Sequence, residues 1–263
     1  MNSKRSRSDS ILPSDDSKRE YVRNMFDDIA FRYRLMNSLL TFGLDAWWRH
    51  KTLIAMDLKP NSLVLDLACG PGEFSKLLAQ QGHRAVGVDF SLGMLRQGVG
   101  SSLISASAPK GSIAKDSATK GSIAKDSAAK VQGDAMSLPV ATNSCDALVC
   151  GFAVRNFLDF DKVLAESTRI LKPRGVAAFL EVSTPTNPAI YRLHNFHFSK
   201  VVPLIGGILS SKAAYRYLPA SVVYLPETNV IIRKFYRYGF THVERQTFSF
   251  GTTQLFLAHK REG

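Results

Sequence analysis

A glycine-containing loop after a short apolar run has the composition of a nucleotide-binding turn. Residues 63–73 read LVLDLACGPGE, so Asp66 ends the apolar run and Gly70, Pro71 and Gly72 follow it. The two glycines allow a backbone to approach a ligand where a Cβ atom would clash. The dinucleotide pattern G-x-G-x-x-G and the P-loop pattern are both absent, and a G-x-G alone also fits an ordinary tight turn.

Two aspartates follow this loop at positions where a nucleoside ligand needs hydrogen-bond acceptors. Asp89 ends a second apolar run, 17 residues after Gly72, and Asp134 follows a third, shorter one. An acidic residue at the end of the second strand can accept hydrogen bonds from ribose hydroxyls, and the other carboxylate suits an adenine amino group. Each aspartate alone is equally well explained as a helix cap or turn residue. The ordered set favours a nucleoside site.

Alternating strand and helix patterns position these residues. Apolar runs at 63–65 and 85–88 predict buried strands, and 73–81 predicts the helix between them. The rhythm resumes in five further segments: 147–154, 159–171, 176–182, 243–248 and 255–258. The last two predict an antiparallel hairpin. Because strands that alternate with helices form parallel sheets, we expect one α/β domain whose ligand site lies at the carboxyl ends of its strands.

Other segments of the chain lack this rhythm. Residues 1–20 are rich in serine and mixed charges and predict a disordered tail. Residues 21–58 have helical apolar spacing and predict a helical cap on a single domain that spans 21–263. Two copies of a decapeptide, KGSIAKDSAT and KGSIAKDSAA, fall within 100–130. This composition cannot fill a core, so the segment is interpreted as a mobile insertion.

Composition limits the location and the partners. No uninterrupted apolar run reaches the ~18 residues that a membrane-spanning helix needs, and there is no secretory signal core. The three cysteines form no C-x-x-C pattern and His194 and His197 have no carboxylate motif beside them, so we expect a reducing cytoplasmic location and no metal site.

Of the net charge of +12, eight cations and two anions in 191–245 contribute +6. Nucleic acid, an anionic membrane leaflet and plain solvation all fit this surface.

Several motifs resemble known methyltransferases. LDLACGPGE, GVDFSLGML, GDAMSLP and LKPRG are similar to class I S-adenosylmethionine methyltransferases. More narrowly, MFDDIAFRYRLMNSLLTFGLDAWWR, FAVRNFLD, FLEVSTP and AYRYLPASV resemble the family that methylates a ring carbon in menaquinone and ubiquinone biosynthesis. The likeness runs from about residue 21 to 259. It implies a Rossmann-like fold with a seven-stranded, mostly parallel sheet, an antiparallel C-terminal strand and helices on both faces.

The resemblance also implies a cofactor and its contacts. S-adenosylmethionine would be the methyl donor, held at Asp66, Gly70, Pro71, Gly72, Asp89, Asp134, Ala135 and Gly151. Pro71 and Gly151 stand where the family frequently has threonine and serine, so a side-chain hydrogen bond is lost at each. Arg34 stands where the family often has aspartate, which puts a contact there in doubt.

The reaction that the resemblance implies requires the removal of a phenolic proton. A quinol carbon becomes a good nucleophile when a phenolic proton leaves, so the enzyme must hold both reactants, exclude water and assist deprotonation. Arg155 would stabilise the phenolate or polarise a water that acts as base, and Asn156 would orient a ring oxygen. Tyr215 would complete the pocket. A structural salt bridge is the alternative for Arg155, and ordinary packing is the alternative for Tyr215. Residues 187–225 would form a helical lid over the prenyl tail.

We therefore predict an S-adenosylmethionine-dependent C-methyltransferase that acts on a prenylated quinol, namely demethylmenaquinol. The benzoquinol of ubiquinone synthesis is the alternative within the class, since both rings fit the same motifs. A pI of about 9.7 keeps an RNA methyltransferase open, but no RNA-binding module or catalytic Asn-Pro-Pro-Tyr-type loop is present, so nucleic acid is not expected. An inactive methyltransferase fold is a third alternative. We expect peripheral contact with an anionic membrane and leave a homodimer open.

Overall fold

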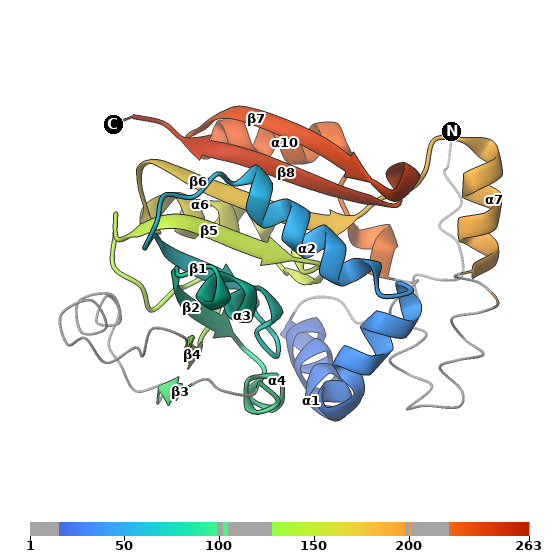
Figure 1. Ribbon diagram of the computed structural model, residues 1–263, viewed down its shortest axis with the longest axis horizontal. Coiled ribbons are helices and arrows are strands. Elements are labelled where there is room, and N and C mark those ends of the chain that lie inside the picture. The colour runs from blue at the N-terminus through green and yellow to red at the C-terminus, as the bar shows by residue number, and fades with distance from the viewer. Residues whose placement is uncertain (1–15, 99–101, 105–127, 198–199, 201–220, 263) are drawn as a thin grey trace.

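The computed structural model describes residues 16–98, 102–104, 128–197, 200 and 221–262 (Figure 1). Residues 1–15, most of the decapeptide repeat, most of the expected lid and Tyr215 lie outside this part of the chain. Helix α1 spans Asp16–Leu40. The prediction of a disordered tail over 1–20 is therefore wrong for its last five residues, because the amphipathic helix extends one turn further toward the N-terminus than the apolar spacing indicates.

An eight-stranded sheet forms the centre of the molecule, in the order β3-β4-β2-β1-β5-β6-β8-β7 (Figure 1). The strands are β1 Leu63–Leu67, β2 Arg84–Asp89, β3 Ser102–Ile104, β4 Ala129–Gln132, β5 Cys145–Gly151, β6 Leu171–Val182, β7 Phe240–Phe248 and β8 Thr253–Lys260. Every neighbouring pair is parallel except those of β8, which runs antiparallel to β6 and β7. This confirms the Rossmann-like sheet and its antiparallel C-terminal strand.

The edge of the sheet beside β4 differs from the prediction in one respect. The three-residue strand β3 pairs with β4 and brings the number of strands to eight, one more than the seven expected. Both β3 and the start of β4 lie inside 100–130, which was predicted to be a mobile insertion throughout. Short apolar stretches at its two ends join the sheet because an edge strand leaves backbone groups available for pairing.

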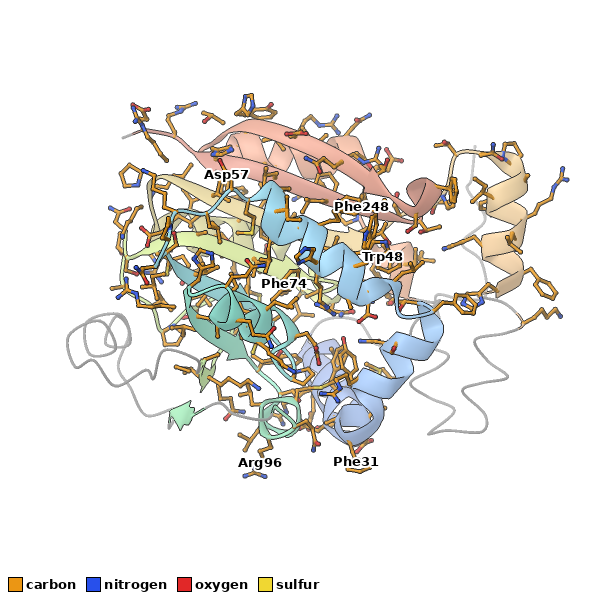
Figure 2. The ribbon with its side chains drawn as sticks, in the orientation of Figure 1. Phe31, Trp48, Asp57, Phe74, Arg96 and Phe248 are labelled. Atoms are coloured by element: carbon orange, nitrogen blue, oxygen red, sulfur yellow. The ribbon has the colours of Figure 1, made fainter. Side chains whose placement is uncertain are left out.

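Helices cover both faces of the sheet, as predicted (Figure 1). One face carries α2 (Leu44–Ala55) and α3 (Glu73–Gln80), and the other carries α6 (Phe160–Ile170) and α10 (Thr228–Arg237). Side chains of β1 alternate between the two layers: Leu65 packs with the α6 and α10 cluster, while Val64 packs with the α2 and α3 cluster. Trp48 and Phe74 belong to the second cluster and lie on the α2 side in Figure 2.

A smaller apolar cluster joins α1 to the edge of the sheet. Val22, Met25 and Ile29 form a buried stripe on α1 that packs on Met94 of α4, which spans Leu92–Arg96. Asp27 of α1 accepts hydrogen bonds from the Ser91 hydroxyl and, at 2.9 Å, from the Gly93 backbone N–H. These contacts fix α1 against the carboxyl ends of the strands, where it becomes one wall of the site described below.

Part of the expected lid is described. Helix α7 spans Pro188–Phe196, and Asn187 caps it: the Asn187 side chain accepts from the Ala189 N–H at 2.9 Å. A short 3₁₀ turn follows at Val222–Tyr224. No helix in the described ranges is both long enough and apolar enough to cross a bilayer.

Candidate active site

The loop between β1 and α3 has the left-handed backbone that its glycines predict. Gly70 and Gly72 have φ angles of 54° and 89°, and Gly72 is the residue immediately before α3. The Gly70 N–H donates to the Asp89 carboxylate at 2.7 Å. Gly70 lines a pocket at the strand ends, whereas Pro71 and Gly72 are not among its lining residues. The loop therefore faces the pocket through its first glycine.

Asp66 supports this loop from behind. Its side chain is buried and accepts hydrogen bonds from the Ser75 N–H at 2.8 Å and the Ser75 hydroxyl at 2.6 Å. Burial raises the pKa of Asp66 to about 6, against the hydrogen bonds from Ser75, which lower it. The structure ties Asp66 to the start of α3 and leaves it outside the pocket lining. Its predicted contribution to cofactor binding would thus be indirect.

Asp89 lies in the pocket, where the sequence placed it. It ends β2, and its two carboxylate oxygens accept from the Gly70 N–H at 2.7 Å and the Ser91 N–H at 2.9 Å. Burial raises the pKa of Asp89 to about 6, and these backbone hydrogen bonds oppose that rise. Ser91 also accepts from the Met94 N–H and caps α4, as predicted. The backbone of two loops therefore orients the Asp89 carboxylate.

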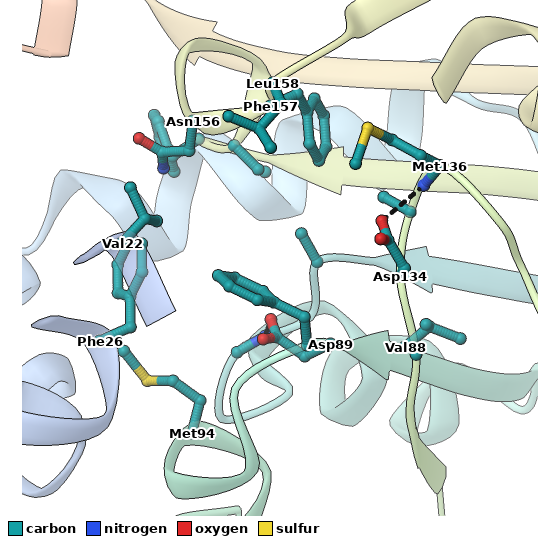
Figure 3. Close-up of a pocket in the computed structure, with 18 of the residues that line it drawn as sticks. Val22, Phe26, Val88, Asp89, Met94, Asp134, Met136, Asn156, Phe157 and Leu158 are labelled. Carbon is teal, nitrogen blue, oxygen red and sulfur yellow. Dashed lines mark hydrogen bonds between the residues drawn. The ribbon is translucent and has the colours of Figure 1, made fainter. Parts of the chain in front are cut away.

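Four further predicted residues line the same pocket: Asp134, Ala135, Gly151 and Asn156. Asp134 follows β4, and one of its carboxylate oxygens accepts from the Met136 N–H at 2.9 Å, the dashed line in Figure 3. Figure 3 also places Val22 and Phe26 of α1 across the pocket from Asp134. The pocket, of about 90 Å³, is therefore bounded by strand ends on one side and α1 on the other.

A larger cavity of about 740 Å³ adjoins this pocket. Phe26, Tyr33, Phe152 and Asn156 line both, so the two spaces share a wall. Most of the remaining lining comes from α1, α2, α7 and the turn before β8, with Val182 of β6 and Val222 beside them, and the surface that faces the cavity is mostly apolar. Phe152 at the shared wall has a φ angle of 59°, which is uncommon for a bulky residue. Such conformations cluster at functional sites.

Arg155 lines the larger cavity but is already paired. Its guanidinium forms an ion pair with Glu181, a fully buried residue of β6. It also donates from Nη1 to the Phe152 carbonyl at 2.9 Å and from Nε to the Ser221 hydroxyl at 3.1 Å. This is the salt-bridge alternative that the sequence left open. Arg155, next to Asn156, thereby connects the loop after β5, strand β6 and Ser221, which lies within the expected lid.

The sequence did not single out two buried cations. Lys130 of β4 is only 2% exposed, and its ammonium donates to the Pro71 carbonyl at 2.6 Å. Burial lowers the pKa of Lys130. Arg49 of α2 is also buried and lines the larger cavity. The only sequence signal for Lys130 was a lysine within the apolar strand sequence AKVQ. The only sequence signal for Arg49 was its position directly after the tryptophan pair.

The cysteines form no part of this site. Cys69, Cys145 and Cys150 are free and buried, and burial raises the pKa of Cys145 to about 11. In the described part of the chain, no group of three or more His, Cys, Asp or Glu side chains is arranged to hold a metal ion.

Comparison with known proteins agrees with the fold and with the family that the sequence resembles. Residues 14–260 match the ubiE/COQ5 methyltransferase family. A demethylmenaquinone methyltransferase of Desulfitobacterium hafniense is 35% identical over 92% of this chain and 91% of its own length. A ubiquinone/menaquinone biosynthesis C-methyltransferase UbiE of Syntrophotalea carbinolica is 37% identical over 89% and 92%.

A solved structure also shares the architecture. It is a putative methyltransferase in complex with the Haloferax volcanii Trm112 methyltransferase activator. Its TM-score is 0.58 at 18% identity, with 92% of this chain and 98% of that chain covered. Together with the family match over nearly the whole sequence, these findings identify the chain: it belongs to the ubiE/COQ5 methyltransferase family.

Proposed function

We propose that this protein transfers a methyl group from S-adenosylmethionine to a ring carbon of a prenylated quinol, with demethylmenaquinol as the substrate. The observation that carries the proposal is the shared wall between the strand-end pocket and the larger, mostly apolar cavity. A volume of about 740 Å³ lies within the range of ~300–1,000 Å³ that is common for small-molecule sites. The names of the relatives from Desulfitobacterium hafniense and Syntrophotalea carbinolica support the same reaction.

The residues of the small pocket fit a nucleoside. Each oxygen of the Asp89 carboxylate accepts one backbone N–H, and a carboxylate has about four lone-pair sites. Two acceptor positions therefore remain for ribose hydroxyls. Val88, Phe90 and Met136 supply apolar surface for a flat base, and Asp134 lies beside them. When bound, S-adenosylmethionine supplies an electrophilic methyl group.

The shared wall would align the second reactant. Asn156 lines both spaces, so its amide can hold a ring oxygen while the ring faces the pocket. The aromatic rings of Phe26 and Phe152 exclude water from this junction, and exclusion of water strengthens every polar contact made there. The Arg155–Glu181 pair holds the loop that carries Asn156. Tyr215 remains proposed as a further part of the pocket.

The test is methyl transfer from radiolabelled S-adenosylmethionine to a demethylmenaquinol and a demethylated benzoquinol, offered in parallel under reducing conditions. Label in the naphthoquinol alone is expected. Label in the benzoquinol would move the assignment to ubiquinone synthesis. Cofactor binding with label in neither quinol would refute the quinol proposal. RNA would then be offered in a third reaction: label in RNA would favour the RNA methyltransferase alternative, and loss of RNA affinity with added salt would support it.

The surroundings of the larger cavity favour contact with a membrane. Four of its lining residues, Phe42, Leu193, Phe196 and Phe250, are between 58% and 83% exposed. Exposed apolar side chains at an interface insert into the headgroup region, and nearby cations attract anionic lipids. We propose a cytoplasmic protein that contacts the inner face of the membrane through this rim. Sedimentation with anionic but not neutral vesicles is expected, and substitution of Leu193 and Phe250 by serine should abolish it. Sedimentation velocity of the same preparation would test for a homodimer.

A further inference from the structure

Arg49 is a buried cation without the hydrogen bonds that burial normally requires. It is 7% exposed and lies on α2, facing the larger cavity. Within the described part of the chain, its buried Nε has no hydrogen-bond partner. The carboxylate of Asp45, one helical turn earlier, lies 4.0 Å from this nitrogen, beyond hydrogen-bonding distance. The guanidinium is therefore only weakly compensated.

The charge of Arg49 also interacts with the buried Asp66 carboxylate, and two aromatic rings lie close to the guanidinium. The guanidinium carbon lies 5.1 Å from the ring centre of Phe74 and 5.4 Å from that of Phe152. Cation–π contacts stabilise a buried arginine, but they do not replace the five N–H donors of a guanidinium. Removing an ion from water carries a large penalty that ion pairs and hydrogen bonds must offset. An arginine placed in this way is ready to bind an anion.

The position of Arg49 indicates which anion. A Cβ atom built on Gly151 would lie 3.0 Å from Nη1 of Arg49, so the absence of a side chain at Gly151 gives the guanidinium its space. Gly151 itself lines the strand-end pocket. Arg49 thus lies on the cavity side of the junction, directly against the wall of the cofactor pocket. A ring oxygen bound to Arg49 would hold the ring beside the methyl group.

Arg155 offers a contrast at the same junction. Its charge is balanced by Glu181, and two further hydrogen bonds occupy its N–H groups. Arg49 has no comparable set among the described residues. Of the two arginines that line the larger cavity among the described residues, Arg49 is therefore the one whose charge has no carboxylate within hydrogen-bonding distance.

We propose that Arg49 binds the ionised oxygen of the quinol and stabilises it during methyl transfer; this rests on the proposed function. The phenolic O–H bond breaks and its proton passes to water, which leaves the oxyanion beside the guanidinium. The adjacent ring carbon then forms a bond to the methyl group while the methyl–sulfur bond breaks, with its electron pair staying on sulfur. Finally the ring carbon releases its hydrogen as a proton to water, which restores the aromatic ring.

The first test uses Arg49→Gln and Arg49→Lys. Removing one oxyanion donor typically lowers turnover about 10²- to 10³-fold, so we expect a loss of this size in Arg49→Gln and a partial recovery in Arg49→Lys. The S-adenosylmethionine Kd, measured by calorimetry, should change less than about twofold, because Arg49 lines the larger cavity and is not among the residues that line the strand-end pocket. The pH at half-maximal turnover should rise in Arg49→Gln. Arg174→Gln, at an exposed arginine, should leave all three quantities unchanged.

A second readout does not depend on turnover. The chromophore 4-nitro-1-naphthol changes absorbance when it ionises, so its pKa can be followed while it is bound. Wild-type protein should lower that pKa by about one unit or more relative to the free probe, since a nearby opposite charge favours the ionised form. Arg49→Gln should abolish the shift while its melting temperature shows that it is folded.

The outcomes separate the two proposals. If wild-type protein methylates neither quinol but still shifts the probe, the quinol reaction fails and the anion site at Arg49 stands. If Arg49→Gln keeps wild-type turnover and probe shift, the inference is overturned. If Arg49→Gln loses affinity for S-adenosylmethionine instead, the guanidinium binds the cofactor carboxylate, which also overturns the assignment to the quinol oxygen.

Discussion

The strand-end pocket and the larger cavity are built in different ways. In the pocket, the carboxylates of Asp89 and Asp134 are held by backbone N–H groups of adjoining loops. In the cavity, helices contribute mainly apolar side chains, and the charged groups differ from one another: Arg155 is paired with Glu181, while the buried Nε of Arg49 has no hydrogen-bond partner in the described part of the chain. The pocket is preorganised by the sheet, and the cavity depends on a few side chains.

This difference predicts where stability and affinity are controlled. Residues held by backbone N–H groups should affect ligand affinity most, because the loops that hold them already belong to the sheet. Residues paired across the cavity wall should affect folding most, since each partner is buried and needs the other. Three substitutions can break or sharpen this distinction.

The largest expected effect is the loss of stability in Arg155→Met. The substitution leaves the fully buried Glu181 without its cation, and breaking a buried pair on one side typically costs about 3–5 kcal/mol. For a chain of this size, the melting temperature should fall by roughly 10 °C. The double variant Arg155→Met with Glu181→Leu should recover most of this loss in a thermal melt.

Turnover of the same double variant then separates the two roles of Arg155. If stability and turnover both return, Arg155 is a structural residue. If stability returns while quinol methylation stays low and the cofactor still binds, the sequence-based catalytic role stands. A single variant as stable as wild type would show that the Arg155–Glu181 pair contributes no net stability, which would remove the contrast with Arg49.

The sheet was largely predictable, because apolar runs separated by glycine turns specify parallel strands. The limits of the prediction are also physical. Strand β3 has three residues and pairs only with β4, so its periodicity is too short to detect. The end of β5 at Gly151 was predicted too late, since Val154 is apolar and buried yet belongs to a 3₁₀ turn. Over so few residues, a buried turn and a buried strand have the same apolar pattern, so the sequence does not distinguish them.

A second, smaller effect concerns pH and the Asp89 carboxylate. Its pKa is raised from 3.8 to about 6, so the folded protein binds more protons than the unfolded chain between these values. The contribution of Asp89 to the free energy of unfolding therefore decreases as pH rises through this window. Cofactor binding has the opposite dependence because it requires the anion. Affinity for S-adenosylmethionine should fall about tenfold between pH 7 and pH 5.

Asp89→Asn is the matched variant for this measurement. Its affinity should already be low at pH 7 and should change little on acidification. Calorimetric titrations at both pH values give the result. A wild-type Kd that is constant down to pH 5 would mean that the bound ribose does not need a charged acceptor, and the pocket would then resemble the cavity rather than differ from it.

The site was less predictable than the fold. The sequence predicted Asp89, Asp134 and Gly151, which all line the strand-end pocket, because strand ends and motif resemblance point to the same edge of the sheet. It gave Asp66 the same role, but the Ser75 side chain that holds Asp66 away from the pocket lies nine positions along the chain in the next helix. Pairing of this kind depends on how a helix docks on a strand, which local patterns do not specify.

The smallest expected effect belongs to Lys130, which supports the pocket from behind. Its ammonium donates to the Pro71 carbonyl, and its side chain fills the space beside Gly72. In Lys130→Met the packing is nearly conserved, while one charged hydrogen bond is lost and one buried cation is removed, so the two effects on stability largely cancel. The loop should become less ordered, and the Kd for S-adenosylmethionine should rise about threefold to fivefold, a cost of ~0.5–1 kcal/mol.

Lys162→Met, at an exposed lysine, is the control and should leave the Kd unchanged. If Lys130→Met instead unfolds the protein without affecting affinity in the folded fraction, the pocket would depend on a buried charge in the same way as the cavity wall does, and the sheet alone would not account for its preorganisation.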